Sequence, residues 1–301
     1  MQHWNRVWAL LIVLSVGLLA AQPLVSITAD LLYLAADRLA DTVNDLPVRW
    51  LFHSVQRLAP KATFVYNRAG VRYADRDNDA AAAAFTAALQ TDPTSGLALN
   101  NLAVIAYRQG DLATALELQK RAIVIDPNRA LLWYNLGVVQ AQQGEQRDAE
   151  QSLREANRIA PTWALPYMQL GKIHLDKQAY AAAIEMANSA LALDAQHAPA
   201  HLIVLDALIG QCDWQAASKA IQTVERTSSS DDAIRLRKAH ILHALGQDEA
   251  ALAQLETLFL RTTDAQLRWQ AGVDIGILQH SAQLHAPDRR LTSLTQGLPC
   301  Q

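Results

Sequence analysis

Two hydrophobic patterns organise this chain: an unbroken apolar run at the amino end, and helical spacing over most of the remaining sequence. No formally charged residue occurs from Val7 to Ala29. A helix of about 20 apolar residues crosses the hydrocarbon layer of a membrane, because it pairs its own backbone amides. The run is long enough and therefore predicts a transmembrane helix. A removed signal peptide and a buried core helix are the alternatives, although Leu19, two residues before Ala21, is bulky for a cleavage site.

The charges that flank this run predict its orientation. The amino side carries Arg6 and the terminal amine, whereas residues 30–45 contain four Asp and one Arg. Basic residues resist translocation. We therefore expect a single-pass membrane protein with its amino end in the cytoplasm and the rest outside it. If the run is a cleaved signal, the protein is instead secreted.

Residues 30–61 show two amphipathic helical segments, and the second begins at Pro47. In the second segment Arg49, His53 and Arg57 share one face, opposite an apolar face. This segment predicts an atypical capping pair of helices, with a helix lying on the membrane surface as the alternative.

Further along the chain, alanine recurs every 34 residues (115 − 81 = 34). A second series of alanines and a series of prolines recur at nearly the same interval, and we call each series a ladder. Small residues let two helices approach closely, and proline, which lacks an amide hydrogen, can end one helix and open the next. The pattern predicts a repeated unit of two helices and a turn. The ladders are Ala81, Ala115, Ala149, Ala183, Ala217 and Ala251; Ala88, Ala122, Ala156 and Ala190; and Pro60, Pro93, Pro127 and Pro161.

Two copies of the unit carry a longer signature: Trp133, Leu136, Gly137, Ala149, Leu153 and Pro161 in one, and Tyr66, Gly70, Tyr73, Ala81, Phe85 and Pro93 in the other. This signature resembles the tetratricopeptide repeat over about residues 62–263, in about six units of which the last two match less closely. The resemblance implies an all-α fold, a right-handed superhelical solenoid of helix-turn-helix repeats, here preceded by the transmembrane helix. A closing helix at 264–286 and an irregular tail at 287–301 complete the expected domains.

Composition adds little beyond favouring helices. Hydrophobic residues make up 51% of the chain and charged residues 18%, which argues against a disordered chain, while 12 Gly and 6% aromatic residues argue against an all-β fold. A net charge of −3 gives no basic stripe of the kind that binds nucleic acid, so no nucleic-acid partner is expected.

Motifs for catalysis are missing from the sequence: it has no P-loop, no nucleophile elbow and no HExxH. We therefore expect no enzyme activity, no cofactor and no small-molecule substrate. His197 and His201 are four residues apart, but no third ligand is in register, so no metal site is expected. Cys212 and Cys300 have no CxxC spacing, and the sequence leaves open whether they pair.

The resemblance also implies that the first helix of each unit lines a concave groove. An Asn side chain can both donate to and accept from a peptide backbone, so a ladder of amides with aromatic neighbours is typical of a surface that holds an extended segment. A clamp for acidic carboxyl tails is not expected, because Val71, Leu131 and Asn135 stand where further basic or amide donors are needed. The predicted peptide-binding groove comprises Asn67, Asn100, Asn101, Tyr107, Arg108, Tyr134, Asn135, Gln142, Met168, Gln169 and Lys172.

An anchor followed by repeats favours a membrane-tethered scaffold or assembly factor that holds a partner protein or peptide in the groove. This plan resembles that of bacterial assembly factors for cytochromes and envelope lipids. The alternative hypothesis is a permanent structural subunit of a membrane protein complex. The sequence does not identify the partner or the oligomeric state.

Overall fold

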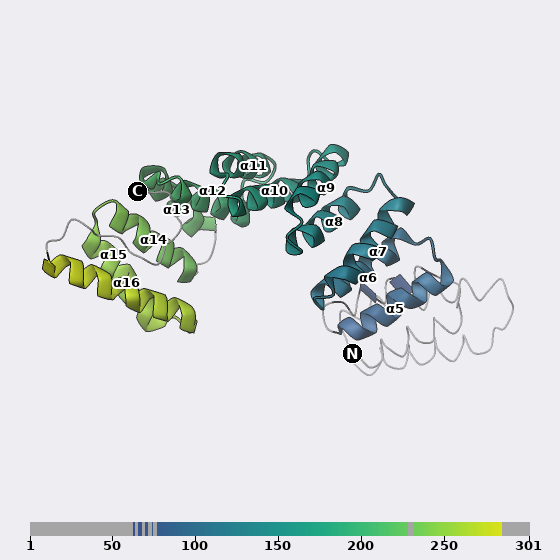
Figure 1. Cartoon of the computed structure of the whole chain (residues 1–301), viewed down its shortest axis with the longest axis horizontal. Coiled ribbons are helices and arrows are strands. Elements are labelled where there is room, and N and C mark those ends of the chain that lie inside the picture. The colour runs from purple at the N-terminus through teal and green to yellow at the C-terminus, as the bar shows by residue number, and fades with distance from the viewer. Residues whose placement is uncertain are drawn as a thin grey trace, which may run out of the picture. The chain divides into compact units, whose positions relative to one another are not determined.

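The computed structural model describes residues 63, 66, 67, 70, 71, 74, 77–227 and 232–284. Every regular element bounded within these residues is an α-helix (Figure 1). In chain order the helices are α5 (Asn78–Thr91), α6 (Gly96–Arg108), α7 (Leu112–Ile125), α8 (Ala130–Gln142), α9 (Gln146–Ile159), α10 (Ala164–Asp176), α11 (Tyr180–Leu193), α12 (Ala198–Gly210), α13 (Trp214–Thr227), α14 (Asp232–Ala244), α15 (Asp248–Arg261) and α16 (Ala265–Leu284).

The helices keep the step that the alanines predict. The first helices of successive units, α6, α8, α10, α12 and α14, begin at residues 96, 130, 164, 198 and 232, and each start lies 34 after the one before (130 − 96 = 34). The second helices, α5, α7, α9, α11, α13 and α15, begin at 78, 112, 146, 180, 214 and 248, again 34 apart (112 − 78 = 34). The repeat is therefore one of structure as well as of sequence.

The turn inside each unit also repeats. It contains one residue with a left-handed backbone, and these residues are 34 apart: Gly110 (φ 82°), Gly144 (φ 82°), Gln178 (φ 59°), Cys212 (φ 59°) and Gly246 (φ 76°). Glycine adopts this conformation without a steric penalty, whereas other residues do so at some cost. Gln178 and Cys212 therefore adopt the backbone conformation that their position in the repeat requires, although neither residue favours it.

Aspartates cap several second helices. Asp77 Oδ1 accepts from the amide of Ala80 at 3.0 Å, and Asp213 Oδ1 accepts from Ala216 at 2.9 Å. Asp111 caps α7 in the same way, and its hydrogen bonds from Thr114 lower the pKa of the carboxyl below its ordinary value. Such caps satisfy amides that a helix start leaves unpaired.

Both alanine ladders lie in the core. Ala81, Ala115, Ala149, Ala183, Ala217 and Ala251 are 0% exposed, and so are Ala88, Ala122, Ala156 and Ala190. A Cβ added to Gly171 on α10 would lie 3.3 Å from the carbonyl oxygen of Ala183 on α11, so the two backbones are close. The second ladder continues in Val224 and Leu258, also 0% exposed, with the same burial but larger side chains.

The chain divides into two compact units, one ending at Gln143 and the other beginning at Gly144. In the first, α6 packs against α5 and α7, and α7 against α8. In the second, consecutive helices from α9 to α16 pack against one another. The division falls between the two helices of the third repeat, a boundary that the sequence does not predict.

No helix in the described ranges is long and apolar enough to cross a membrane. The predicted anchor at residues 7–29, the predicted helix pair at 30–61 and the predicted tail at 287–301 lie outside the described residues. The anchor, the orientation and the secreted alternative therefore stay predictions.

Close packing at the alanine ladders predicts a sharp contrast between two neighbouring alanines of α11. Ala183→Leu inserts a larger side chain at a site that is 0% exposed, and we expect it to lower the free energy of unfolding by about 1–3 kcal/mol. Ala181→Leu makes the same change at an exposed site of α11 and should stay within about 0.5 kcal/mol of the wild type. Urea unfolding followed by circular dichroism measures both. Equal losses would show that the ladder does not limit the helix spacing.

Candidate peptide-binding surface

Amide side chains occupy one position of the first helices in phase with the repeat. Asn101 on α6, Asn135 on α8 and Gln169 on α10 lie at successive steps (135 − 101 = 34 and 169 − 135 = 34), and Asn67 lies one step before Asn101 (101 − 67 = 34). The shared position places each amide on the same side of its own helix.

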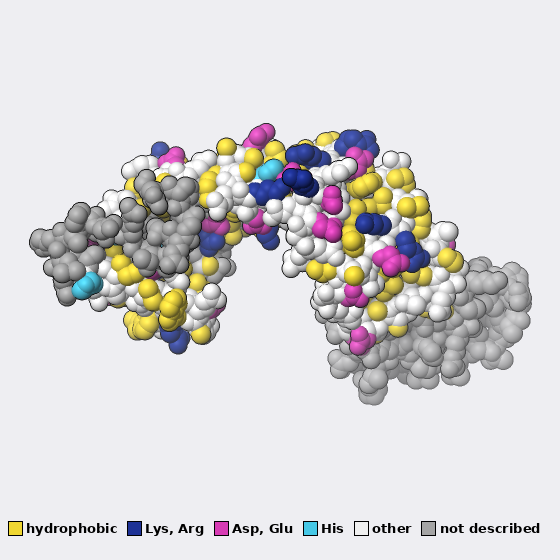
Figure 2. Space-filling model, in the orientation of Figure 1, with side chains coloured by type: hydrophobic (Ala, Val, Ile, Leu, Met, Phe, Trp, Pro, Cys, Tyr) yellow, Lys and Arg dark blue, Asp and Glu magenta, His cyan; other side chains and the backbone are white. Residues whose placement is uncertain are grey.

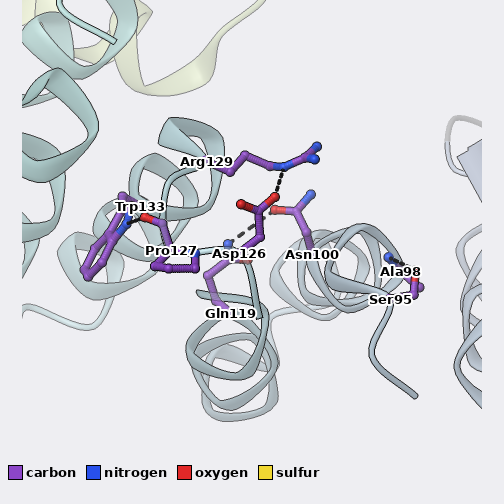
Figure 3. A network of polar contacts seen from close by, with 8 residues as sticks. All are labelled: Ser95, Ala98, Asn100, Gln119, Asp126, Pro127, Arg129 and Trp133. Atoms are coloured by element: carbon purple, nitrogen blue, oxygen red, sulfur yellow. Dashed lines mark hydrogen bonds and ion pairs between the residues drawn. The ribbon is translucent and has the colours of Figure 1, made fainter. Parts of the chain in front are cut away.

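In the first compact unit Asn101 and Asn135 join a buried network, part of which is drawn in Figure 3. Asn100 is 3% exposed, and its Oδ1 accepts from Asn135 Nδ2 at 2.8 Å and from Gln119 Nε2 at 3.3 Å. Gln119 Nε2 also donates to the carbonyl oxygen of Leu132 at 2.8 Å. The network connects α6, α7 and α8, so Asn100 and Asn135 have structural partners within the chain.

Asn101 leaves one end of its amide unused, and so does Gln119, whose buried Oε1 has no hydrogen-bond partner. Asn101 Oδ1 accepts from Asn100 Nδ2 at 3.2 Å, while its own Nδ2 is buried and has no hydrogen-bond partner. Since the network fixes which atom is the oxygen, the unused atom is a donor. A buried donor without a partner carries a free-energy cost that a bound acceptor would relieve.

This side chain lines a small hollow between α6 and the described residues that precede α5. The hollow has a volume of about 210 Å³, and most of its lining is apolar. Arg108 stands at the hollow and donates from Nη1 to the carbonyl oxygen of Ala74 at 2.6 Å. The lining residues are Val71, Ala74, Phe85, Asn101, Val104, Ile105 and Arg108.

Asn67 resembles Asn101 in having one amide atom without a partner. It is 7% exposed, its Nδ2 donates to Ser95 Oγ at 3.4 Å, and its Oδ1 has no partner. Ser95 is the residue before α6, and its Oγ also caps that helix by accepting from the amide of Ala98. Asn67 therefore offers an unused acceptor, whereas Asn101 offers an unused donor.

The remaining predicted residues divide between the two compact units. In the first, Tyr107 and Tyr134 are half-buried, and Gln142 is exposed. In the second, Met168 packs against the core of α11 and α12, Gln169 is half-buried, and Lys172 is exposed.

Several residues in and beneath this surface were not predicted from the sequence. Gln119 is one of them, although a Gln between Leu118 and Ala122 on an apolar helix face is a signal that could have been noticed. Val104 and Ile105 line the hollow beside Asn101 but look like ordinary core positions in the sequence.

A larger hollow, about 580 Å³, runs along α9 in the second unit and is lined only by residues of that helix: Arg147, Glu150, Gln151, Arg154, Glu155 and Arg158. Its charged groups largely pair with each other, since Arg158 bonds Glu155 and Arg154 bonds Glu150. Ion pairs this exposed contribute little to stability or recognition. We interpret this face as a solvated outer surface.

Glu150 has the best-connected carboxylate of that face. Burial raises its pKa, but the hydrogen bond and charge of Lys177, with the charges of His174 and Arg154, lower it by more, so the pKa lies below its ordinary value. Lys177 follows α10, so this ion pair connects α9 with the end of the next helix.

Metal-ligating groups do not gather in this part of the chain: among the described residues, no three His, Cys, Asp or Glu side chains come together as a metal site. His201 Nε2 lies 3.0 Å from the carbonyl oxygen of Ala195. Cys212 is disulfide-bonded, and Cys300 lies outside the described residues.

Residues 66–130, 118–151 and 165–197 each match a family model described as a tetratricopeptide repeat. The chain contains tetratricopeptide repeats. Together the matches cover five of the helices from α5 to α11 completely and parts of the other two. Among curated proteins, none matches this chain.

Solved structures of tetratricopeptide-repeat type share the fold. The pilF protein of Pseudomonas aeruginosa is 20% identical, with a TM-score of 0.63 over 70% of this chain and 96% of its own. A tetratricopeptide repeat protein of Parabacteroides merdae is 17% identical, with a TM-score of 0.60 over 73% of this chain and 88% of its own. YrrB, a repeat protein with an unusual peptide-binding site, is 18% identical, with a TM-score of 0.52 over 64% of this chain and 98% of its own. Identities this low show a common fold alone.

The buried amide network predicts that Gln119 is needed for stability. Gln119→Met keeps the shape of the side chain but removes the donor from the carbonyl oxygen of Leu132 and from Asn100, so we expect a loss of about 1–3 kcal/mol in the free energy of unfolding. Gln151→Met, at an exposed site, should change it by less than about 0.5 kcal/mol. Urea unfolding compares the two. A neutral Gln119→Met would contradict a structural role for the network.

The Glu150 ion pair predicts a pH effect with a definite sign. Because the pKa of Glu150 is lowered in the folded state, its contribution to stability is present above the unfolded pKa and is lost as pH falls through the folded pKa. Lys177→Met should raise the pKa of Glu150 more than Arg154→Met does, since Lys177 is the larger cause. Carboxyl carbon shifts in an NMR titration report this pKa. An unchanged value in Lys177→Met would contradict the assignment.

Proposed function

We propose that this chain is a membrane-tethered scaffold that binds an extended segment of a partner protein along the first helices of its repeats. Tetratricopeptide repeats generally mediate protein–protein interaction, and the chain contains them over most of α5 to α11. The likeness to YrrB supports the same kind of ligand for this fold. The tether rests on the apolar run at residues 7–29, and an assembly role rests on the combination of tether and repeats.

One observation carries the peptide part of the proposal: the unused Asn101 Nδ2 lies beside an apolar hollow. An extended peptide offers a backbone carbonyl and a side chain next to each other, which matches one donor next to one hollow. The volume of about 210 Å³ is below the roughly 300–1,000 Å³ of sites for small-molecule ligands, which favours a single side chain.

The lining also indicates which side chain fits. Val71 is 55% exposed at the hollow and Leu131 is 39% exposed on α8, at positions where a cation would favour an acidic partner. Arg108 is already bonded to the Ala74 carbonyl. An apolar side chain therefore fits this surface better than a carboxylate.

Asn101 and Asn67 are the residues that we assign to direct contact, because each has an amide atom without a partner. Asn135 donates a hydrogen bond to Asn100, and Asn100 also accepts one from Gln119. We assign them the role of holding α6, α7 and α8 in register beneath the ligand.

A peptide selected by display against the detergent-solubilised full chain tests the proposal. We expect Asn101→Ala to weaken the selected peptide about tenfold, because it removes one buried hydrogen bond. Val104→Trp, which fills the hollow, should weaken it by at least as much. Asn188→Ala changes an exposed Asn on the second helix α11 and should leave affinity unchanged.

Fluorescence anisotropy of the labelled peptide measures all three variants, and circular dichroism checks that each is folded. A peptide that binds the wild type, Asn101→Ala and Val104→Trp equally well would place its site elsewhere and contradict the proposal.

A further inference from the structure

Cys212 stands at a turn position where the repeat favours glycine. The turn between α12 and α13 is built like the turn between α6 and α7: the amide of Cys212 donates to the carbonyl oxygen of Ile209 at 3.0 Å, as the amide of Gly110 does to Tyr107 at 3.0 Å. Both turn residues have a left-handed backbone, with φ angles of 59° and 82°. Since glycine forms this turn without a steric penalty, the turn itself does not need a cysteine side chain.

The sulfur of Cys212 takes part in a covalent bond instead. The sequence leaves open whether the two cysteines of the chain pair. In the structure Cys212 is disulfide-bonded, and the chain offers it one possible partner, Cys300, which lies outside the described residues. A bond between them would close a loop of 88 residues (300 − 212 = 88) that contains α13, α14, α15 and α16.

The described helices place the end of α16 on the same edge of the second unit as Cys212. The first helices α12, α14 and α16 alternate with second helices and so run in the same direction (Figure 1). Arg237 Nη2 on α14 donates to Asp206 Oδ2 on α12 at 2.9 Å, and His240 Nε2 on α14 lies 2.7 Å from Asp274 Oδ2 on α16. The carboxyl ends of α12 and α16 are therefore separated sideways by two helix spacings, roughly 16–20 Å.

The chain after α16 is long enough to cover this distance. Helix α16 has 20 residues and α12 has 13, so α16 extends seven residues further (20 − 13 = 7), or about 10 Å along its axis. Sixteen residues lead from Leu284 to Cys300 (300 − 284 = 16), and they can span up to about 50 Å when extended. The Cα atoms of a disulfide have to come within about 7 Å of each other, which this length allows.

The carboxyl end of the array is where a covalent link has a large effect. A helix at the end of an array has neighbours on one side only, and such ends unfold locally more easily than the middle. Leu260 on α15 and Trp269 on α16 are 79% and 67% exposed. Figure 2 shows hydrophobic side chains on the surface over these two helices. Apolar groups that remain in water do not help to hold the helices in place.

We propose that Cys212 and Cys300 form an intramolecular disulfide that links the two ends of the last four described helices, and that it forms outside the cytoplasm. The bond joins the two Sγ atoms. The two thiols give up two protons and two electrons, which a disulfide of that compartment accepts by exchange as it becomes a dithiol. Disulfides persist in oxidising compartments and are rare in the cytosol. The charges around residues 7–29 predict the same placement of the repeats.

Peptide mapping of the full chain tests the pairing directly. Intact cells are treated with iodoacetamide before lysis, so that any free thiol is blocked, and the chain is then purified in detergent. Trypsin cuts after Lys177, Lys219 and Arg290 and yields peptides 178–219 and 291–301, each with one cysteine. We expect mass spectrometry to find these two peptides joined without reductant and separate after reduction. Separate alkylated peptides from the wild type would overturn the proposal, and so would a disulfide between two chains.

Thermal unfolding tests what the link does. Cys300→Ser removes it without changing a described residue, and we expect the thermal midpoint to fall by about 5–15 °C. Dithiothreitol should lower the midpoint of the wild type to the same value and leave that of Cys300→Ser unchanged. Adding Cys212→Gly to Cys300→Ser should raise the midpoint by about 1–4 °C, because glycine fits the left-handed turn.

A wild-type midpoint in Cys300→Ser, or a wild type that dithiothreitol does not affect, would contradict a link across the last four helices. The hollow beside Asn101 lies in the first compact unit and Cys212 in the second. Peptide binding should therefore persist in Cys300→Ser, so the loss of either property does not imply the loss of the other.

Discussion

The distance between neighbouring helices, set by residues too small to hold them apart, is the constraint on which the rest of this structure depends. Six alanines in one ladder and four in the other are 0% exposed, and each ladder places one alanine in every repeat that it crosses. Where two helices approach this closely, neither can turn about its axis without bringing a larger side chain into the contact. The ladders therefore fix the rotation of each helix as well as its spacing. Every residue at a given position of the repeat is then brought to an equivalent place in its own unit.

Equivalent placement makes an amide ladder possible, but it does not make the amides equivalent. Asn101 and Asn135 are in phase, yet Asn135 donates to Asn100 while Asn101 keeps a buried donor without a partner. The difference comes from Gln119 on α7, which supplies the second hydrogen bond to Asn100 and ties the network to the backbone of α8 at Leu132. Gln119 Oε1 stays buried without a partner, but the hydrogen bonds of Gln119 Nε2 connect three helices and make the network costly to disturb. Because Asn100, Gln119 and Asn135 are held by these hydrogen bonds, the amide of Asn101 has a defined position for a ligand.

The sequence predicts features that depend on the spacing of the repeat and on the size of side chains. It does not predict a property that depends on which residue lies next to another in the folded chain. The pairs of helices can be predicted from spacing alone, because the alanines and the prolines recur at nearly the same interval along the chain. The left-handed turn could be predicted at Gly110, Gly144 and Gly246, but not at Gln178 and Cys212, which adopt it at the same step of the repeat without being glycine. In the same way, sequence spacing names Asn100 and Asn101 together. Only the three-dimensional arrangement shows that one is 3% exposed and bonded on both sides while the other lines a hollow.

The same reasoning explains why the last described helix behaves differently from the others. A repeat unit cannot bury its apolar face alone, so each end of an array needs a cover. At α16 the inner face meets this need through Ala271, Leu278 and the contact of Asp274 with His240. Gly272 lies beside α15, where an added Cβ would be 3.2 Å from the ring of Phe259, and Trp269 is 67% exposed. The buried contacts of α16 with α14 and α15 therefore close the apolar face of the last described repeat.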